Sequence, residues 1–240
     1  TIMTFRKLIY SVLILAVFYV ATHISSWIPP QYRPGYGFSY MIWILTIAAC
    51  WPLLGKRLLS ITGLSSSVRV GVLWGLVFVS PMLVGFTFSD APAQFAPALL
   101  VTKALLPGFL EELMFRGFLV GMLIRVAGWR WLPAALINAA LFGIGHWFQG
   151  ATLAEAVMAS LFTAVGGLWF AWLFVVWQHN LWLVVTLHTV MNACWVIWQV
   201  DTTAAGDQFA NLLRLSTIML SVVVTLLLQR QRPATDLECK

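Results

Sequence analysis

Eight apolar segments follow one another along the chain, and each is about as long as a stretch that crosses a lipid bilayer. Crossing the hydrocarbon core takes about 20 helical residues. Lipid offers no partner to an exposed backbone N–H or C=O, so such segments fold as helices. The segments cover residues 7–27, 38–55, 70–88, 97–124, 131–148, 155–177, 180–199 and 211–229. We therefore predict an all-α, polytopic membrane bundle of about eight transmembrane helices, with residues 1–240 forming a single integral membrane domain.

The composition supports this prediction and excludes one reading of the net charge. Hydrophobic residues make up 61% of the chain and charged residues 9%, against about 25% charged in a typical soluble domain. The net charge of +6 does not indicate a nucleic-acid partner, because Lys and Arg in a membrane protein mark its cytoplasmic loops.

The basic residues are distributed unevenly between alternate connectors. With a cytoplasmic N-terminus, the outer side has only Arg33, Lys103 and Arg214, while Arg116 falls inside a span. The inner side has Arg6, Lys7, Lys56, Arg57, Arg69, Arg125, Arg130, Arg230, Arg232 and Lys240. This bias predicts that both termini are cytoplasmic.

Small residues recur at four-residue spacing in two of the spans. Gly117 and Gly121 form a GxxxG pair, and a second stripe consists of Ala159, Thr163, Gly167 and Ala171. Such stripes allow helices to approach closely in lipid, and helix packing alone explains them.

A few polar side chains fall inside the predicted spans instead of in the connectors. An ionisable side chain at the centre of a membrane helix costs about 2.5–3.5 kcal/mol on insertion scales, so these groups face one another or a wet cavity. The group consists of Glu111, Glu112, Arg116, His146, His188 and Asn192. We expect them to share one interior polar site.

The spacing within the 97–124 segment separates the two adjacent carboxylates. Glu112 and Arg116 are four residues apart, so they share a helix face and are placed to form an ion pair. Glu111 is turned by about 100° from Glu112. Glu112 is then neutralised by Arg116, which leaves Glu111 available. The dipeptide Pro107-Gly108 predicts a kink or a helix start just before this pair.

The remaining polar residues also pair at four-residue spacing. Phe142 and His146 share one face of their helix, and His188 and Asn192 share one face of theirs. Asn138 and Gln149 lie on and just beyond the 131–148 segment, either lining the site or bonding to neighbours.

Four interpretations fit this set of residues on spacing alone. Glu111 and His146 could activate a water for peptide hydrolysis, with His188 and Asn192 donating to the oxyanion. Glu111, His146 and His188 could instead hold a zinc ion that activates the water. The same groups could form the proton path of a proton-coupled transporter, or a satisfied polar cluster that only fixes helix register.

Three short motifs in this order resemble those of the CPBP family of intramembrane proteases. EELMFR at 111–116 matches E-E-x-x-x-R, FGIGH at 142–146 matches F-x-x-x-H, and HTVMN at 188–192 matches H-x-x-x-N. The family includes CAAX proteases, bacteriocin-processing enzymes and the Ras-converting CAAX endopeptidase. The resemblance covers a catalytic core at about residues 95–200.

The resemblance implies a glutamate-dependent intramembrane endopeptidase. It makes Glu111 the general base, lets His146 hold the water and makes an oxyanion hole of His188 and Asn192. Supporting roles fall to Glu112, Arg116 and Phe142. It also implies that no cofactor or metal is needed, with zinc as the alternative.

The expected partners are the lipid bilayer and a membrane-embedded or lipidated protein or peptide substrate, and the oligomeric state is not readable from the sequence. Glu111 precedes Arg125 by about 20 Å of helix, and His146 lies at the outer end of its segment. We therefore expect an enzyme of the bacterial inner (plasma) membrane whose site lies toward the outer half of the bilayer.

Overall fold

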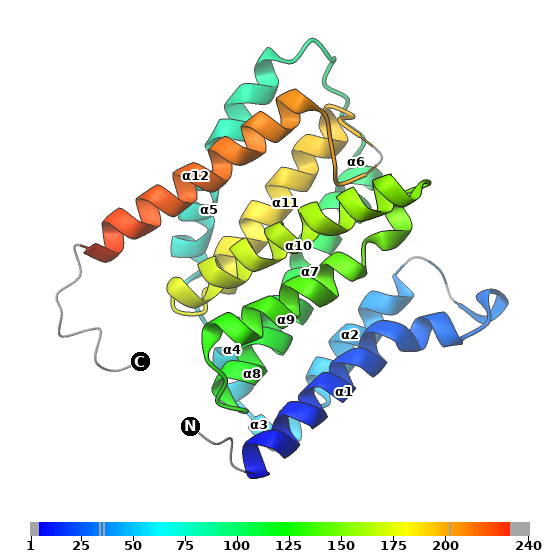
Figure 1. Ribbon diagram of the computed structural model, residues 1–240, viewed down its shortest axis with the longest axis vertical. Coiled ribbons are helices and arrows are strands. Elements are labelled where there is room, and N and C mark those ends of the chain that lie inside the picture. The colour runs from blue at the N-terminus through cyan, green and yellow to red at the C-terminus, as the bar shows by residue number, and fades with distance from the viewer. Residues whose placement is uncertain (1–4, 34, 36, 202, 231–240) are drawn as a thin grey trace.

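The computed structural model of the chain describes residues 5–33, 35, 37–201 and 203–230 (Figure 1). Every regular element within these ranges is helical. The predicted all-α class is therefore confirmed.

Each predicted apolar segment contains a helix. By length and composition, five helices among the described residues suffice to cross a membrane, whereas two other apolar stretches, 38–54 and 181–197, are shorter. Outside the 97–124 segment, the predicted apolar segments contain α1 Phe5–Trp27, α2 Phe38–Ala48, α3 Trp51–Leu54, α5 Val68–Gly85, α9 Trp131–Ile144, α10 Leu153–Val176, α11 Leu181–Ile197 and α12 Gln208–Arg230.

The 97–124 segment is helical without a break but changes its hydrogen-bonding pattern along the way. It consists of α6 Pro97–Leu99, the π-helical η3 Leu100–Leu105, α7 Leu106–Glu112, the π-helical η4 Leu113–Val120 and α8 Gly121–Arg125. The helix does not start at Pro107, because a π-helical stretch leads directly into it. Glu111 and Glu112 lie where α7 passes into η4, and π-helical turns often occur at functional sites.

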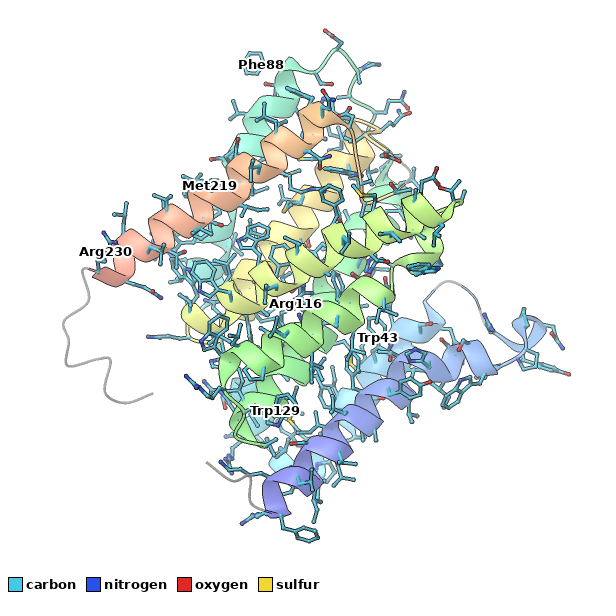
Figure 2. All side chains as sticks on the ribbon, in the orientation of Figure 1. Trp43, Phe88, Arg116, Trp129, Met219 and Arg230 are labelled. Carbon is cyan, nitrogen blue, oxygen red and sulfur yellow. The ribbon has the colours of Figure 1, made fainter. Side chains whose placement is uncertain are left out.

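The helices pack as a bundle with the polar site in its interior. In Figure 1, α10 and α11 lie in the middle, α5 and α12 on one side, and α1 and α2 on the other. The α9–α10 pair and the α5–α11 pair are in extensive contact, and α7 packs against α11. Figure 2 shows Arg116 near the middle of the molecule, where its side chain is fully buried.

The predicted small-residue stripes do mediate close packing. A Cβ atom at Gly117 would lie 2.9 Å from the carbonyl oxygen of Thr62, and one at Gly121 would collide with the carbonyl oxygen of Ile61. Their partner is the short helix α4 Arg57–Ile61 and the residue after it, an element that the apolar pattern did not predict. On the second stripe, a Cβ at Gly167 would lie 3.3 Å from Ala139 Cα.

Candidate active site

The buried ion pair between Glu112 and Arg116 forms as the four-residue spacing predicts. Arg116 Nη1 donates to Glu112 Oε1 across 2.9 Å, and both side chains are 0% exposed. The guanidinium also lies over two aromatic rings, with Cζ 4.5 Å from the centroid of Phe142 and 5.3 Å from that of Phe170. A desolvated cation over an aromatic face gains about 2 kcal/mol, which offsets part of the burial cost.

The same carboxylate oxygen holds a second partner that spacing did not reveal. His188 Nδ1 lies 2.7 Å from Glu112 Oε1 and donates to it. Glu112 therefore joins α7 to α11 and fixes which nitrogen of His188 is turned away from it. Residue spacing does not say how two helices are aligned with each other. Only the Arg116 partner of Glu112 was therefore predictable from the sequence.

Glu111 is oriented differently from its neighbour. Its Oε2 lies 3.9 Å from His188 Nε2, and its side chain is 17% exposed, whereas Glu112 is fully buried. His188 is 12% exposed. The predicted separation of the two carboxylates is thus present in the structure: one is enclosed and paired, and the other is open to its surroundings beside an imidazole.

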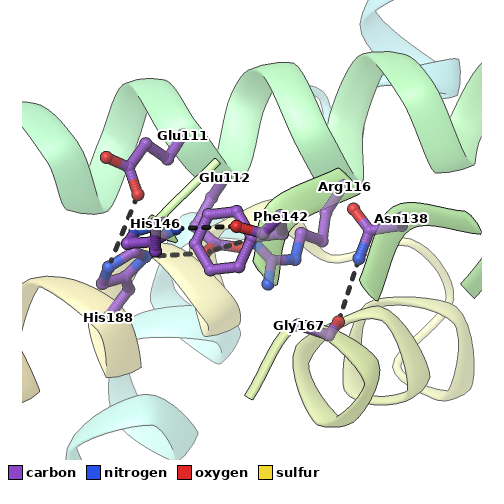
Figure 3. Close-up of polar contacts among 8 residues, drawn as sticks. All are labelled: Glu111, Glu112, Arg116, Asn138, Phe142, His146, Gly167 and His188. Atoms are coloured by element: carbon purple, nitrogen blue, oxygen red, sulfur yellow. Dashed lines mark hydrogen bonds and ion pairs between the residues drawn. The ribbon is translucent and has the colours of Figure 1, made fainter. Parts of the chain in front are cut away.

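His146 lies in the turn that follows α9. Its Nδ1 donates to the carbonyl oxygen of Phe142 across 2.7 Å (Figure 3). In a neutral ring this leaves Nε2 as an acceptor. The ring of Phe142 contacts His146 at 4.6 Å between centroids and faces His188 at 6.4 Å. One aromatic ring thus lies near both imidazoles and also against the guanidinium of Arg116.

Asn192 follows His188 by one turn of α11 and is partly exposed. Its side chain makes no hydrogen bond to another residue in the described ranges. The structure therefore brings Glu111, Glu112, Arg116, Phe142 and His188 into one contact network, which His146 joins through Phe142. Asn192 is placed near this network only by its position on α11.

A glycine sets how closely the acidic helix approaches α11. A Cβ atom at Gly108 would lie 2.7 Å from Thr189 Cα and would collide with Thr189 Oγ1. Thr189 is the neighbour of His188, and Gly108 lies one turn before the two glutamates. The absence of a side chain at Gly108 therefore places both carboxylates within reach of His188. No sequence motif marks this role of Gly108 or the contact of Phe170 with Arg116.

The described residues contain no group of three or more His, Cys, Asp and Glu side chains that could hold a metal ion. In both histidines Nδ1 is already engaged, His146 with Phe142 and His188 with Glu112. A cavity of about 250 Å³ lies elsewhere, between α5, α10 and α12, and contains no residue of the site.

Comparison with known proteins shows which family this part of the chain is similar to. Residues 92–194 match the family described as type II CAAX prenyl endopeptidase Rce1-like. A search of curated proteins found no match. The matched region contains all three motifs, and it confirms the predicted resemblance to CAAX and CPBP intramembrane proteases. Together with the apolar helices, the match indicates a protease that is an integral membrane protein.

Proposed function

We propose, from the Rce1-like match of residues 92–194, that this chain is an endopeptidase that hydrolyses a peptide bond of a membrane-associated or lipid-anchored substrate with a glutamate-activated water. One observation carries the proposal. An open carboxylate, Glu111, lies beside an imidazole, His188, whose other nitrogen is anchored on a fully buried ion pair.

In the proposed reaction Glu111 is the general base. Its carboxylate takes a proton from a water held between Glu111 and His146 Nε2, and the hydroxide attacks the peptide carbonyl carbon. Glu111 then returns the proton to the leaving nitrogen as the C–N bond breaks, so one water yields one carboxylic acid and one amine. Positioned acid–base groups of this kind contribute about 10²–10⁴-fold in rate.

His188 and Asn192 are the proposed donors to the oxyanion. Because His188 Nδ1 already donates to Glu112, donation from Nε2 as well requires a ring that carries both protons. With that ring charged, the two carboxylates are balanced by two cations, Arg116 and His188. The buried Glu112–Arg116 pair thus supports the proposed donor by position and by charge.

The proposed substrate is a C-terminal tail or a peptide precursor, cleaved from the extracytoplasmic side of a bacterial plasma membrane. The distribution of Lys and Arg supports cytoplasmic termini and, with them, an outer location of the connector at 149–154. An Ala151→Cys variant tests this in intact cells, with the parent protein as the background for the native cysteines. Labelling by a membrane-impermeant maleimide is expected, and labelling only after the cells are opened would overturn the topology.

Cleavage in proteoliposomes tests the activity itself. The purified protein is mixed with a prenylated CAAX peptide and with an unprenylated membrane-spanning peptide, and the products are identified by mass spectrometry. We expect cleavage that survives a metal chelator. Loss on chelation with recovery on adding zinc would establish the zinc-dependent alternative, and proton flux without any cleavage would establish the transporter.

A further inference from the structure

Arg214 is a half-buried cation that the proposed reaction does not use. It lies on α12, one of the helices long and apolar enough to cross a membrane, and no carboxylate pairs with it in the ranges that the structure describes. Its Cζ lies 4.5 Å from the ring centroid of Trp195 and 5.3 Å from that of Phe162. Since a cation inside a membrane helix costs about 2.5–3.5 kcal/mol, these contacts need an explanation.

The polar partner of Arg214 is the connection between α11 and α12. Arg214 Nη2 donates to the carbonyl oxygen of Ala204 across 2.9 Å. The backbone N–H of the same residue donates to Gln149 Oε1 across 3.1 Å. Both backbone polar groups of Ala204 are therefore held by side chains, one from α12 and one from the turn after α9.

Trp195 contacts two further residues of this connection, Thr203 and Gly206, while Asn211 Nδ2 donates to the carbonyl oxygen of Ala205 across 2.9 Å. Trp195 Nε1 donates to the carbonyl oxygen of Thr203 across 3.2 Å. Gly206 packs flat against the same indole with φ +68°, and a Cβ atom there would lie 2.6 Å from the ring. We call residues 203–206 the brace segment.

The brace segment connects two parts of the candidate site, the turn that carries His146 and the C-terminal part of α11. Gln149 follows His146 by three residues, and its N–H donates to the carbonyl oxygen of His146 across 3.0 Å. Trp195 follows Asn192 by three residues on α11. The brace segment is thus attached through Ala204 to the turn that carries His146, and through Thr203 and Gly206 to Trp195, which follows His188 and Asn192 on α11.

We propose that Arg214 and Gln149 are positioning residues that hold the brace segment and thereby fix the spacing between His146 and the α11 residues His188 and Asn192. The inference rests on the proposed function for its catalytic consequence. Arg suits this role because its planar guanidinium stacks on aromatic faces while donating in its own plane.

The test compares Arg214→Ala, Gln149→Ala and the double variant with Arg33→Ala. Arg33 is a matched control, because it also donates to backbone carbonyl oxygens, those of Ile28 at 2.8 Å and Ser26 at 3.1 Å, but in the α1–α2 connection. With the membrane-spanning peptide in liposomes, well below the melting temperature, we expect each single variant to lower kcat by roughly 10- to 100-fold with KM unchanged. Gln149→Glu keeps an acceptor oxygen and is expected to retain most of the rate.

The double variant distinguishes one shared role of Arg214 and Gln149 in holding the brace segment from two independent effects on the rate. Because both residues act on Ala204, the double variant is expected to lose no more than the worse single variant. Multiplied losses, an unchanged kcat, or an equal loss in Arg33→Ala would overturn the proposal.

Hydrogen exchange tests the structural part of the proposal, the coupling between the brace segment and the turn that carries His146, and it needs no substrate. We expect Arg214→Ala to raise exchange both in the brace segment and at residues 146–150, and Arg33→Ala to leave both unchanged. Faster exchange in the brace segment alone would overturn the coupling. A wild-type protein that cleaves no peptide would contradict the proposed function and leave this measurement intact.

Discussion

His188 Nδ1 lies 2.7 Å from Glu112 Oε1, the same oxygen that accepts from Arg116. This shared oxygen gives two adjacent glutamates different surroundings. Glu112 is enclosed and bound to two partners, and Glu111 stays open beside the far nitrogen of the same imidazole. The proposed mechanism depends on this difference, because it assigns the base to the carboxylate that is not enclosed.

Glu112→Gln is expected to destabilise the protein as well as inactivate it. Removing one partner of a buried ion pair leaves an uncompensated charge and costs about 3–5 kcal/mol, here with Arg116 fully buried. Thermal unfolding in detergent measures the loss. A Glu112→Gln protein with wild-type stability and activity would contradict the supporting role.

Arg116→Lys is expected to lose stability although it keeps the charge. A lysine has no planar group to place over the rings of Phe142 and Phe170, so the contact of the guanidinium with these rings, worth about 2 kcal/mol, is lost in large part. The unfolding midpoint measures this loss. An unchanged midpoint would show that charge alone is needed at this position.

Gly108→Ala is expected to push α7 away from α11 and to lower activity. The new Cβ would meet the backbone of Thr189, and overpacking of this kind costs about 1–3 kcal/mol. Gly166→Ala is the matched control, because a Cβ at that helical position meets nothing within 4 Å. Equal activity in both variants would show that the close approach of the helices does not position the glutamates.

Asn192→Ala is expected to slow the reaction by about 10²–10³-fold, the effect of removing one oxyanion donor, with little change in stability. Asn180→Ala should show the opposite pattern. Asn180 donates to the carbonyl oxygen of Ser67 across 3.1 Å and caps α11, far from the glutamates in the chain. A full rate for Asn192→Ala would remove it from the proposed oxyanion hole.

The sequence predicted the helices and the features that lie on a single helix. Apolar length sets where the chain crosses lipid, and the helix period sets that Glu112 meets Arg116 while Glu111 turns away. The contacts of Gly117 and Gly121 followed from their spacing, although their partner α4 did not, because five residues are too few to give an apolar pattern.

Features that depend on register between helices were not predictable. The hydrogen bond from His188 to Glu112 and the contact of Gly108 with Thr189 both depend on how α7 lies against α11. Arg214 was placed outside from the charge distribution alone, and its stacking on Trp195 depends on how the α11–α12 connection folds back. The π-helical stretches around Pro107 were not predictable either, because no simple sequence pattern marks them.

The cleavage rate of Glu111→Gln tests whether Glu111 is the general base. In liposomes, at saturating peptide and with chelator present, we expect the cleavage rate to fall by at least about 10²-fold. The melting temperature should stay near that of the wild type, because Glu111 is partly exposed and its Oε2 lies 3.9 Å from His188 Nε2. Ser160→Ala should keep the wild-type rate, since no serine takes part. A folded Glu111→Gln protein that cleaves as fast as the wild type would show that Glu111 is not the general base.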